Sequence, residues 1–87
     1  MNETNIAPPT MPAANTKWGR AITETEKSEK GLSTLDKVVI GALAGSATDK
    51  ATCVAYLRQL SKETIQAKCT TGFASNESRW QGIAAIL

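Results

Sequence analysis

Histidine is absent from the 87-residue sequence, cysteine occurs twice, and aromatic residues make up only 5% of the chain. Without histidine, the chain lacks the commonest general base and the usual partner of a cysteine nucleophile. Cys53 and Cys69 also lack the further Cys or His ligands that a structural zinc site requires. We therefore expect no enzymatic activity, no metal site and no cofactor. Both cysteines should fill space in an apolar core.

The sequence also lacks long hydrophobic segments. The longest apolar run, 38–44, is far too short to span a bilayer, and residues 1–20 contain no apolar segment of a secretory signal. We expect a cytoplasmic protein that makes no membrane contact and whose cysteines are reduced. The net charge of +2 permits contact with nucleic acid but is low for a chain that works on DNA.

Proline is confined to the start of the chain, where all three prolines lie among Asn, Thr and Ala. Residues 1–17 have too little apolar surface to offset the entropy lost on ordering, so we predict a disordered tail there. Residues 18–32 are interpreted as a linker and partner-binding segment, with a solvated helical turn or two as the alternative. Residues 33–87 are predicted to form one all-α domain of three to four helices.

Serines mark the starts of the predicted helices. Ser33 begins a sequence like a capping box, and the apolar spacing that follows predicts a helix at about 34–44, ended by Gly45. Ser46 and Ser61 offer two further starts. Because no Gly or Pro lies between Ser46 and residue 72, these two helices could also be one continuous helix.

The last predicted helix carries an apolar stripe at i, i+3, i+4 and i+7. Its residues are Trp80, Ile83, Ala84 and Leu87. Since so small a core would gain from burying this stripe, we predict a homo-oligomer, most simply a dimer, with Trp80, Ile83 and Leu87 at or near the binding surface. Burial of the stripe within the chain's own core is an equally open alternative.

A Trp and an Arg stand close together in the polar segment before the helical domain. Trp18 and Arg20 belong to the residue types most enriched at binding hot spots. We therefore assign them to a partner-binding site together with Trp80, Ile83 and Leu87. The alternative for Trp18 is that its side chain folds back onto the helices.

A second function stays open, namely DNA binding by a helix-turn-helix. The string 60–65, Leu-Ser-Lys-Glu-Thr-Ile, is similar to the turn and recognition-helix start of bacterial regulators. Ala51 or Ala55 would be the small residue of the first helix and Ile65 the buried residue of the second. The residues facing DNA would be Lys62, Gln66 and Lys68. The usual turn glycine is missing and basic residues are few, which favours protein binding.

The polar tail, the segment Lys17-Trp18-Gly19-Arg20 and the helical region 32–87 together resemble the small regulatory proteins of temperate phages. Within that group the chain is similar to antirepressors. The resemblance implies a stoichiometric inhibitor that binds a transcriptional repressor and takes it off its operator.

Overall fold

A computed structural model describes residues 7–69 and 77–87, and in these ranges it contains five helices and no strand. The helices are α1 (Lys17–Glu26), α2 (Thr34–Ala44), α3 (Ala47–Leu57), α4 (Lys62–Lys68) and α5 (Glu77–Ile86). The all-α prediction is confirmed, with slightly more helices than the three to four expected. No helix in the described ranges is long and apolar enough to cross a membrane.

Two capping boxes fix the starts of α2 and α3. The Asp36 amide donates to Ser33 Oγ (3.1 Å), and Asp36 Oδ2 accepts from the Ser33 amide (2.8 Å). Ser46 and Asp49 repeat this exchange at 3.2 Å in both directions. Aspartate therefore serves where glutamate is more usual, and α2 occupies the range that its sequence predicts.

Helices α3 and α4 are separate. The Arg58 amide still bonds back to the Val54 carbonyl, and the chain then turns before Ser61. Ser61 Oγ accepts from the Thr64 amide at 3.0 Å and caps the start of α4. The serine cap therefore separates α3 from α4 although no Gly or Pro lies between them. The Ser61 side chain accepts from a backbone N–H that would bond to a backbone carbonyl in a continuous helix.

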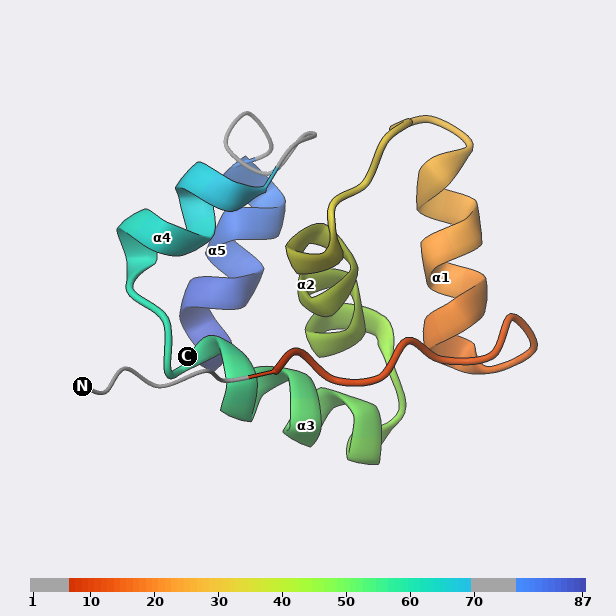
Figure 1. Ribbon diagram of the computed structural model, residues 1–87, viewed down its shortest axis with the longest axis horizontal. Coiled ribbons are helices and arrows are strands. Elements are labelled where there is room, and N and C mark those ends of the chain that lie inside the picture. Colours follow the sequence, from red (N-terminus) through yellow and green to blue (C-terminus); the bar gives the residue numbers. More distant parts are fainter. Residues whose placement is uncertain (1–6, 70–76) are drawn as a thin grey trace.

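Helix α2 is the centre of the fold and packs against α1, α3 and α5 (Figure 1). Its residues 38–42 are all buried, as expected for a helix surrounded on all sides. Helix α1 approaches closely at Gly41, where an added Cβ would lie 2.7 Å from Trp18 Nε1. The same Cβ would lie 2.6 Å from Cys53 Sγ of α3, so Gly41 is where three helices converge.

The predicted linker at 18–32 is largely a helix, α1, and the tail before it is not supported as disordered. The Gly19 amide donates to Thr16 Oγ1 at 3.0 Å, which caps α1. Trp18 then anchors the helix in the core. The composition of the segment did not predict the burial of this side chain. Residues 7–16 cross the helical body as an irregular segment, while 1–6 lie outside the described residues (Figure 1).

Candidate protein-binding surface

The apolar stripe of α5 is divided between the core and the surface. Ile83 is completely buried, so its predicted place at the surface is wrong. A close approach helps to bury it: a Cβ added at Gly82 would lie only 3.1 Å from Leu43 Cδ2 of α2. The spacing i, i+3, i+4 identified an apolar face but could not show which residue of that face meets α2.

The rest of the stripe remains accessible. Trp80 is half-buried and Ala84 is exposed. Leu87, at the end of the stripe, is 39% exposed and is one of two large hydrophobic residues classed as exposed in the described part of the chain. At i, i+4 and i+7 these side chains follow one line along the helix. We call Trp80, Ala84 and Leu87 the α5 edge.

Two cations, one at the end of α3 and one at the start of α4, lie beside the α5 edge. Lys62 Nζ lies 5.4 Å from the centroid of the Trp80 ring, within the range of a cation–π contact. Arg58 donates from Nη2 to the carbonyl of Ile86 at 3.2 Å, near the negative end of the α5 dipole. Apolar side chains bordered by positive charge suit a partner surface that combines apolar and acidic side chains.

Trp18 and Arg20 do not form a joint surface. Trp18 is 3% exposed, and its Nε1 donates to the Lys37 carbonyl at 2.8 Å. The alternative of a side chain that folds back onto the helices describes Trp18 correctly, so its side chain is not presented to a partner. Arg20 is exposed and donates to the carbonyl of Asn15.

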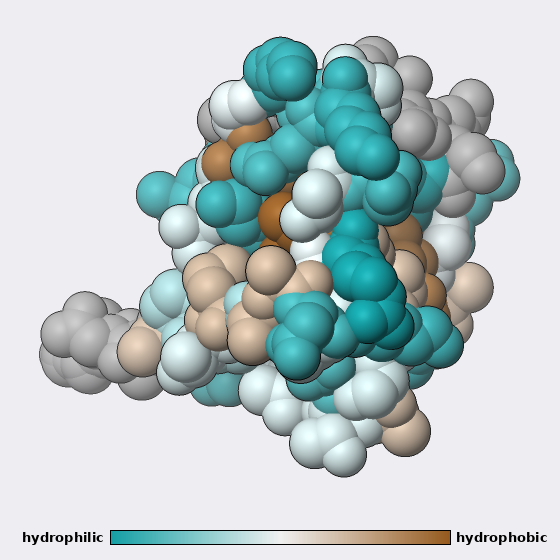
Figure 2. Space-filling view, turned by 90° about the vertical axis from the view of Figure 1, so that its right-hand side faces the viewer, coloured by the Kyte–Doolittle hydropathy of each residue, from teal (hydrophilic) through white to brown (hydrophobic). Residues whose placement is uncertain are grey.

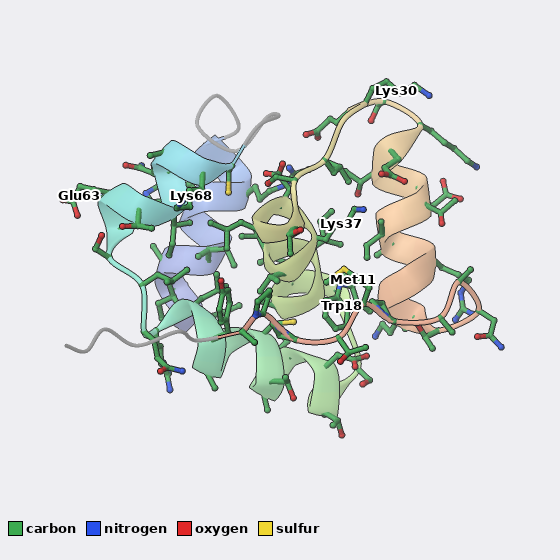
Figure 3. All side chains as sticks on the ribbon, in the orientation of Figure 1. Met11, Trp18, Lys30, Lys37, Glu63 and Lys68 are labelled. Atoms are coloured by element: carbon green, nitrogen blue, oxygen red, sulfur yellow. The ribbon has the colours of Figure 1, made fainter. Side chains whose placement is uncertain are left out.

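The residues assigned to DNA readout lie on α4 but in mixed environments. Lys62 and Lys68 are exposed and Gln66 is half-buried, with Lys68 labelled on α4 in Figure 3. Ile65 is 1% exposed, as expected for the buried residue of the second helix.

The first helix of the predicted helix-turn-helix does not match the expected pattern. Ala51 and Ala55 are both exposed, so the expected small-residue contact between the two helices is not made through them. The register of α3 instead turns Cys53, Val54 and Leu57 inward.

A polar cluster that the sequence did not reveal joins distant parts of the chain. Arg79 of α5 holds Glu29 through two hydrogen bonds, Nη2 to Oε2 at 2.8 Å and Nη1 to Oε1 at 3.2 Å. Both side chains are mostly buried, at 14% and 22% exposure. Asp36 of α2 is also buried, and it lies close enough to Cys69 to raise the pKa of that thiol. Fifty residues separate Glu29 from Arg79, so no local pattern signals the pair.

Both thiols are held in the protonated form. Burial, and then the neighbouring Asp49, raises the pKa of Cys53 to about 11. Burial also raises the pKa of Cys69 to about 12, with the charge and hydrogen bond of Asp36 adding to the shift and Arg79 opposing it. A protonated thiol is a poor nucleophile and metal ligand. Among the described residues, no three His, Cys, Asp or Glu side chains are grouped to hold a metal ion.

Comparison of the chain with models of protein families, with curated proteins and with solved structures gave no match.

Proposed function

We propose that this chain is a non-enzymatic regulatory protein that binds another protein through the α5 edge and inactivates it. The carrying observation is the exposure of Ala84 and Leu87 beside the half-buried Trp80, although Ile83 of the same helix is fully buried. Tryptophan beside apolar and cationic neighbours is a usual composition of a binding hot spot. The lack of histidine in the sequence supports binding rather than catalysis as the activity.

The proposed target is a transcriptional repressor of a temperate phage, as the resemblance to antirepressors implies. Such an inhibitor works by differential binding. It must bind the free or rearranged repressor more tightly than the operator-bound repressor, because only that difference shifts the equilibrium.

The test is capture of host proteins by the full chain and by two matched variants. Leu87→Asp places a charge in the α5 edge, while Ala47→Asp places the same charge at an exposed position at the start of α3. We expect a nuclease-resistant protein that Leu87→Asp loses and Ala47→Asp retains. The captured protein, once purified, should release its operator DNA when the native chain is added. Equal capture by all three chains would refute the α5 edge as the binding surface.

Self-association through the same edge is part of the proposal and has its own measurement. Light scattering at high micromolar concentration should give the mass of a dimer for the native chain and of a monomer for Leu87→Asp. If the native chain is monomeric, the proposed homo-oligomer is refuted. The capture experiment then tests whether the edge binds a different protein.

DNA binding remains the second candidate, because α3 and α4 are separate helices and Lys62 and Lys68 are exposed. Two observations argue against DNA binding. Ala51 and Ala55 are exposed, and Lys62 contacts Trp80. DNA binding predicts that Lys62→Ala and Lys68→Ala weaken binding to duplex DNA and flatten its salt dependence. The protein-binding proposal predicts that Leu87→Asp matters and Lys68→Ala does not.

A further inference from the structure

The segment that precedes α1 lies across the helical body without being fastened to it along its length. We call residues 7–12 the arm. It passes across α2 toward the start of α1 (Figure 1), and Pro9 and Pro12 are half-buried. Among the described residues, no hydrogen bond joins residues 7–12 to a helix. The arm is therefore held by side-chain packing alone.

Fastening of the chain begins only after the arm. The Thr16 amide and hydroxyl both donate to the Ala13 carbonyl, at 3.1 and 2.7 Å. This turn rests on Gly19, where an added Cβ would collide with the Ala13 carbonyl and lie 3.0 Å from the Cα of Ala14. Because Gly19 has no side chain, the backbone of Ala13 and Ala14 can pass close to α1 at this point. Glycine is a poor helix former, so the same residue weakens α1.

The groove under the arm is only partly filled. A hollow of about 170 Å³ remains between Met11, Pro12 and Ala14 on one side and the α1–α2 surface on the other. Its helical floor consists of Gly19, Ile22, Thr23 and Lys37. Figure 3 labels Met11 beside Trp18 and Lys37, between α1 and α2. The hollow is open to solvent, since Met11, Ala14 and Thr23 in its lining are exposed, and it has room for a larger side chain.

A second hollow borders the arm at Pro8 and shares no lining residue with the first. Pro8 forms one wall of a cleft of about 400 Å³, and the helices contribute Ser33, Thr34, Leu35, Tyr56 and Lys68. Figure 2 presents the α1 side of the molecule, where hydrophilic side chains cover most of the surface. The hollow and the cleft thus border the arm at separate places, the hollow at Met11 and Pro12 and the cleft at Pro8.

We propose that the hollow between α1 and α2 under the arm is a binding groove for an extended, proline-containing segment of a partner protein, and that the arm is a weak ligand of the same chemistry that the partner displaces. Proline favours the extended conformation before binding and so lowers the entropy lost on docking. A partner side chain larger than alanine would fill the 170 Å³ hollow that the arm leaves. The groove lies on the α1 side of α2 and the α5 edge on the other side, so this inference does not rest on the proposed function (Figure 1).

Two full-length variants separate the arm from the groove. Pro9→Asp with Pro12→Asp charges the two half-buried prolines and should undock the arm while leaving the helical floor unchanged. Ala7→Asp with Thr10→Asp adds the same charge at exposed positions and should leave the arm in place. The probe is a dye-labelled peptide with the sequence of residues 7–14, and the measurement is its fluorescence anisotropy.

We expect the undocked variant to bind the peptide at least about tenfold more tightly than the native chain or the control, because the docked arm reduces the fraction of competent molecules. A peptide with leucine in place of Ala14 should bind more tightly still. Adding Ile22→Asp to the undocked variant should abolish binding, since the charge would stand on the floor of the hollow.

Three results would overturn the assignment. One is peptide binding that is equal for native and undocked chains, or absent from both. Another is binding that survives Ile22→Asp. The third is a native dimer that dissociates in the Pro9→Asp, Pro12→Asp variant, which would assign the groove to the arm of a second copy. Should the undocked variant fail to fold, the leucine peptide is added to the native chain. Displacement must then speed amide exchange at Thr16, whose amide donates to Ala13, and unchanged exchange refutes the proposal.

Discussion

The indole Nε1 of Trp18 donates a 2.8 Å hydrogen bond to the backbone carbonyl of Lys37, and this contact joins the start of α1 to the first turn of α2. A residue that the sequence placed in a binding segment is therefore a structural anchor. Its ring lies against Gly41, the glycine at which α1, α2 and α3 meet.

Replacing Trp18 should cost stability. We expect Trp18→Ala to lower the free energy of unfolding by about 3–5 kcal/mol, the usual range for removing a buried Trp. Trp18→Phe keeps part of the packing and should cost less. Arg20→Ala, at an exposed position of the same helix, should stay within about 0.5 kcal/mol of the native value. Urea unfolding followed by circular dichroism measures all three, and a Trp18→Ala protein as stable as Arg20→Ala would contradict the anchor.

Gly41 should not tolerate alanine. The added methyl would press on the Cys53 thiol and the Trp18 indole, so we expect a loss of about 1–3 kcal/mol from overpacking despite alanine's better helix propensity. Gly82→Ala is the matched control, because its Cβ would meet only the flexible end of Leu43 at 3.1 Å. Thermal unfolding should rank Gly41→Ala clearly below Gly82→Ala. The reverse ranking would show that the three helices do not converge at Gly41.

The Glu29–Arg79 pair should matter more than an exposed pair of the same kind. Removing one partner of a largely buried, two-bond ion pair leaves a poorly solvated charge, so we expect Glu29→Gln to destabilise by about 1–3 kcal/mol. Glu24 and Lys27 are 70% and 67% exposed, and Glu24→Gln should change stability by less than about 0.5 kcal/mol. Chemical denaturation at low and high salt compares them. Equal effects would mean that the Glu29–Arg79 pair does not hold the connection between α1 and α2, residues 27–33, against α5.

The cysteines should make the fold sensitive to alkaline pH. Their pKa values rise from 9.0 to about 11 for Cys53 and about 12 for Cys69, so the folded chain holds both protons more tightly than the unfolded chain. This contribution is complete below about pH 9 and is lost as the pH rises through the folded pKa values. Between about pH 7.5 and pH 10, the native chain should therefore lose more stability than the double variant Cys53→Ala, Cys69→Ala.

Each cysteine replacement should leave the binding activity unchanged at neutral pH, with only a modest loss of stability, because the thiols fill space. Loss of binding by Cys53→Ser in a chain that remains folded would show a chemical role for that thiol.

Local signals predicted local structure well. Ser33 and Ser46, each followed three residues later by aspartate, mark helix starts that the structure confirms. Ser61 likewise starts α4, although the sequence alone could not decide whether α3 continued through it. These signals work because a cap involves residues within one turn of each other.

Long-range contacts were beyond the reach of the sequence. Residues 18–32 looked polar enough to be a linker, and only the position of α2 shows that a single indole fixes α1. The stripe of α5 was found by spacing, but which of its residues is buried depends on where α2 lies against it. Ile83 was therefore predicted at the surface although it is buried in the core. Leu87 is exposed, as a residue of a binding surface must be.

The two-residue connection of Gly45 and Ser46 between α2 and α3 has a consequence for the order of folding. Closing so short a loop costs little entropy, whereas α5 reaches α2 only after a long stretch of chain has been closed. The α2–α3 hairpin should accordingly form early, and α5 should dock last and open first. Amide protons of α5 would then exchange with solvent faster than those of α2, and a protein bound at the α5 edge would slow them.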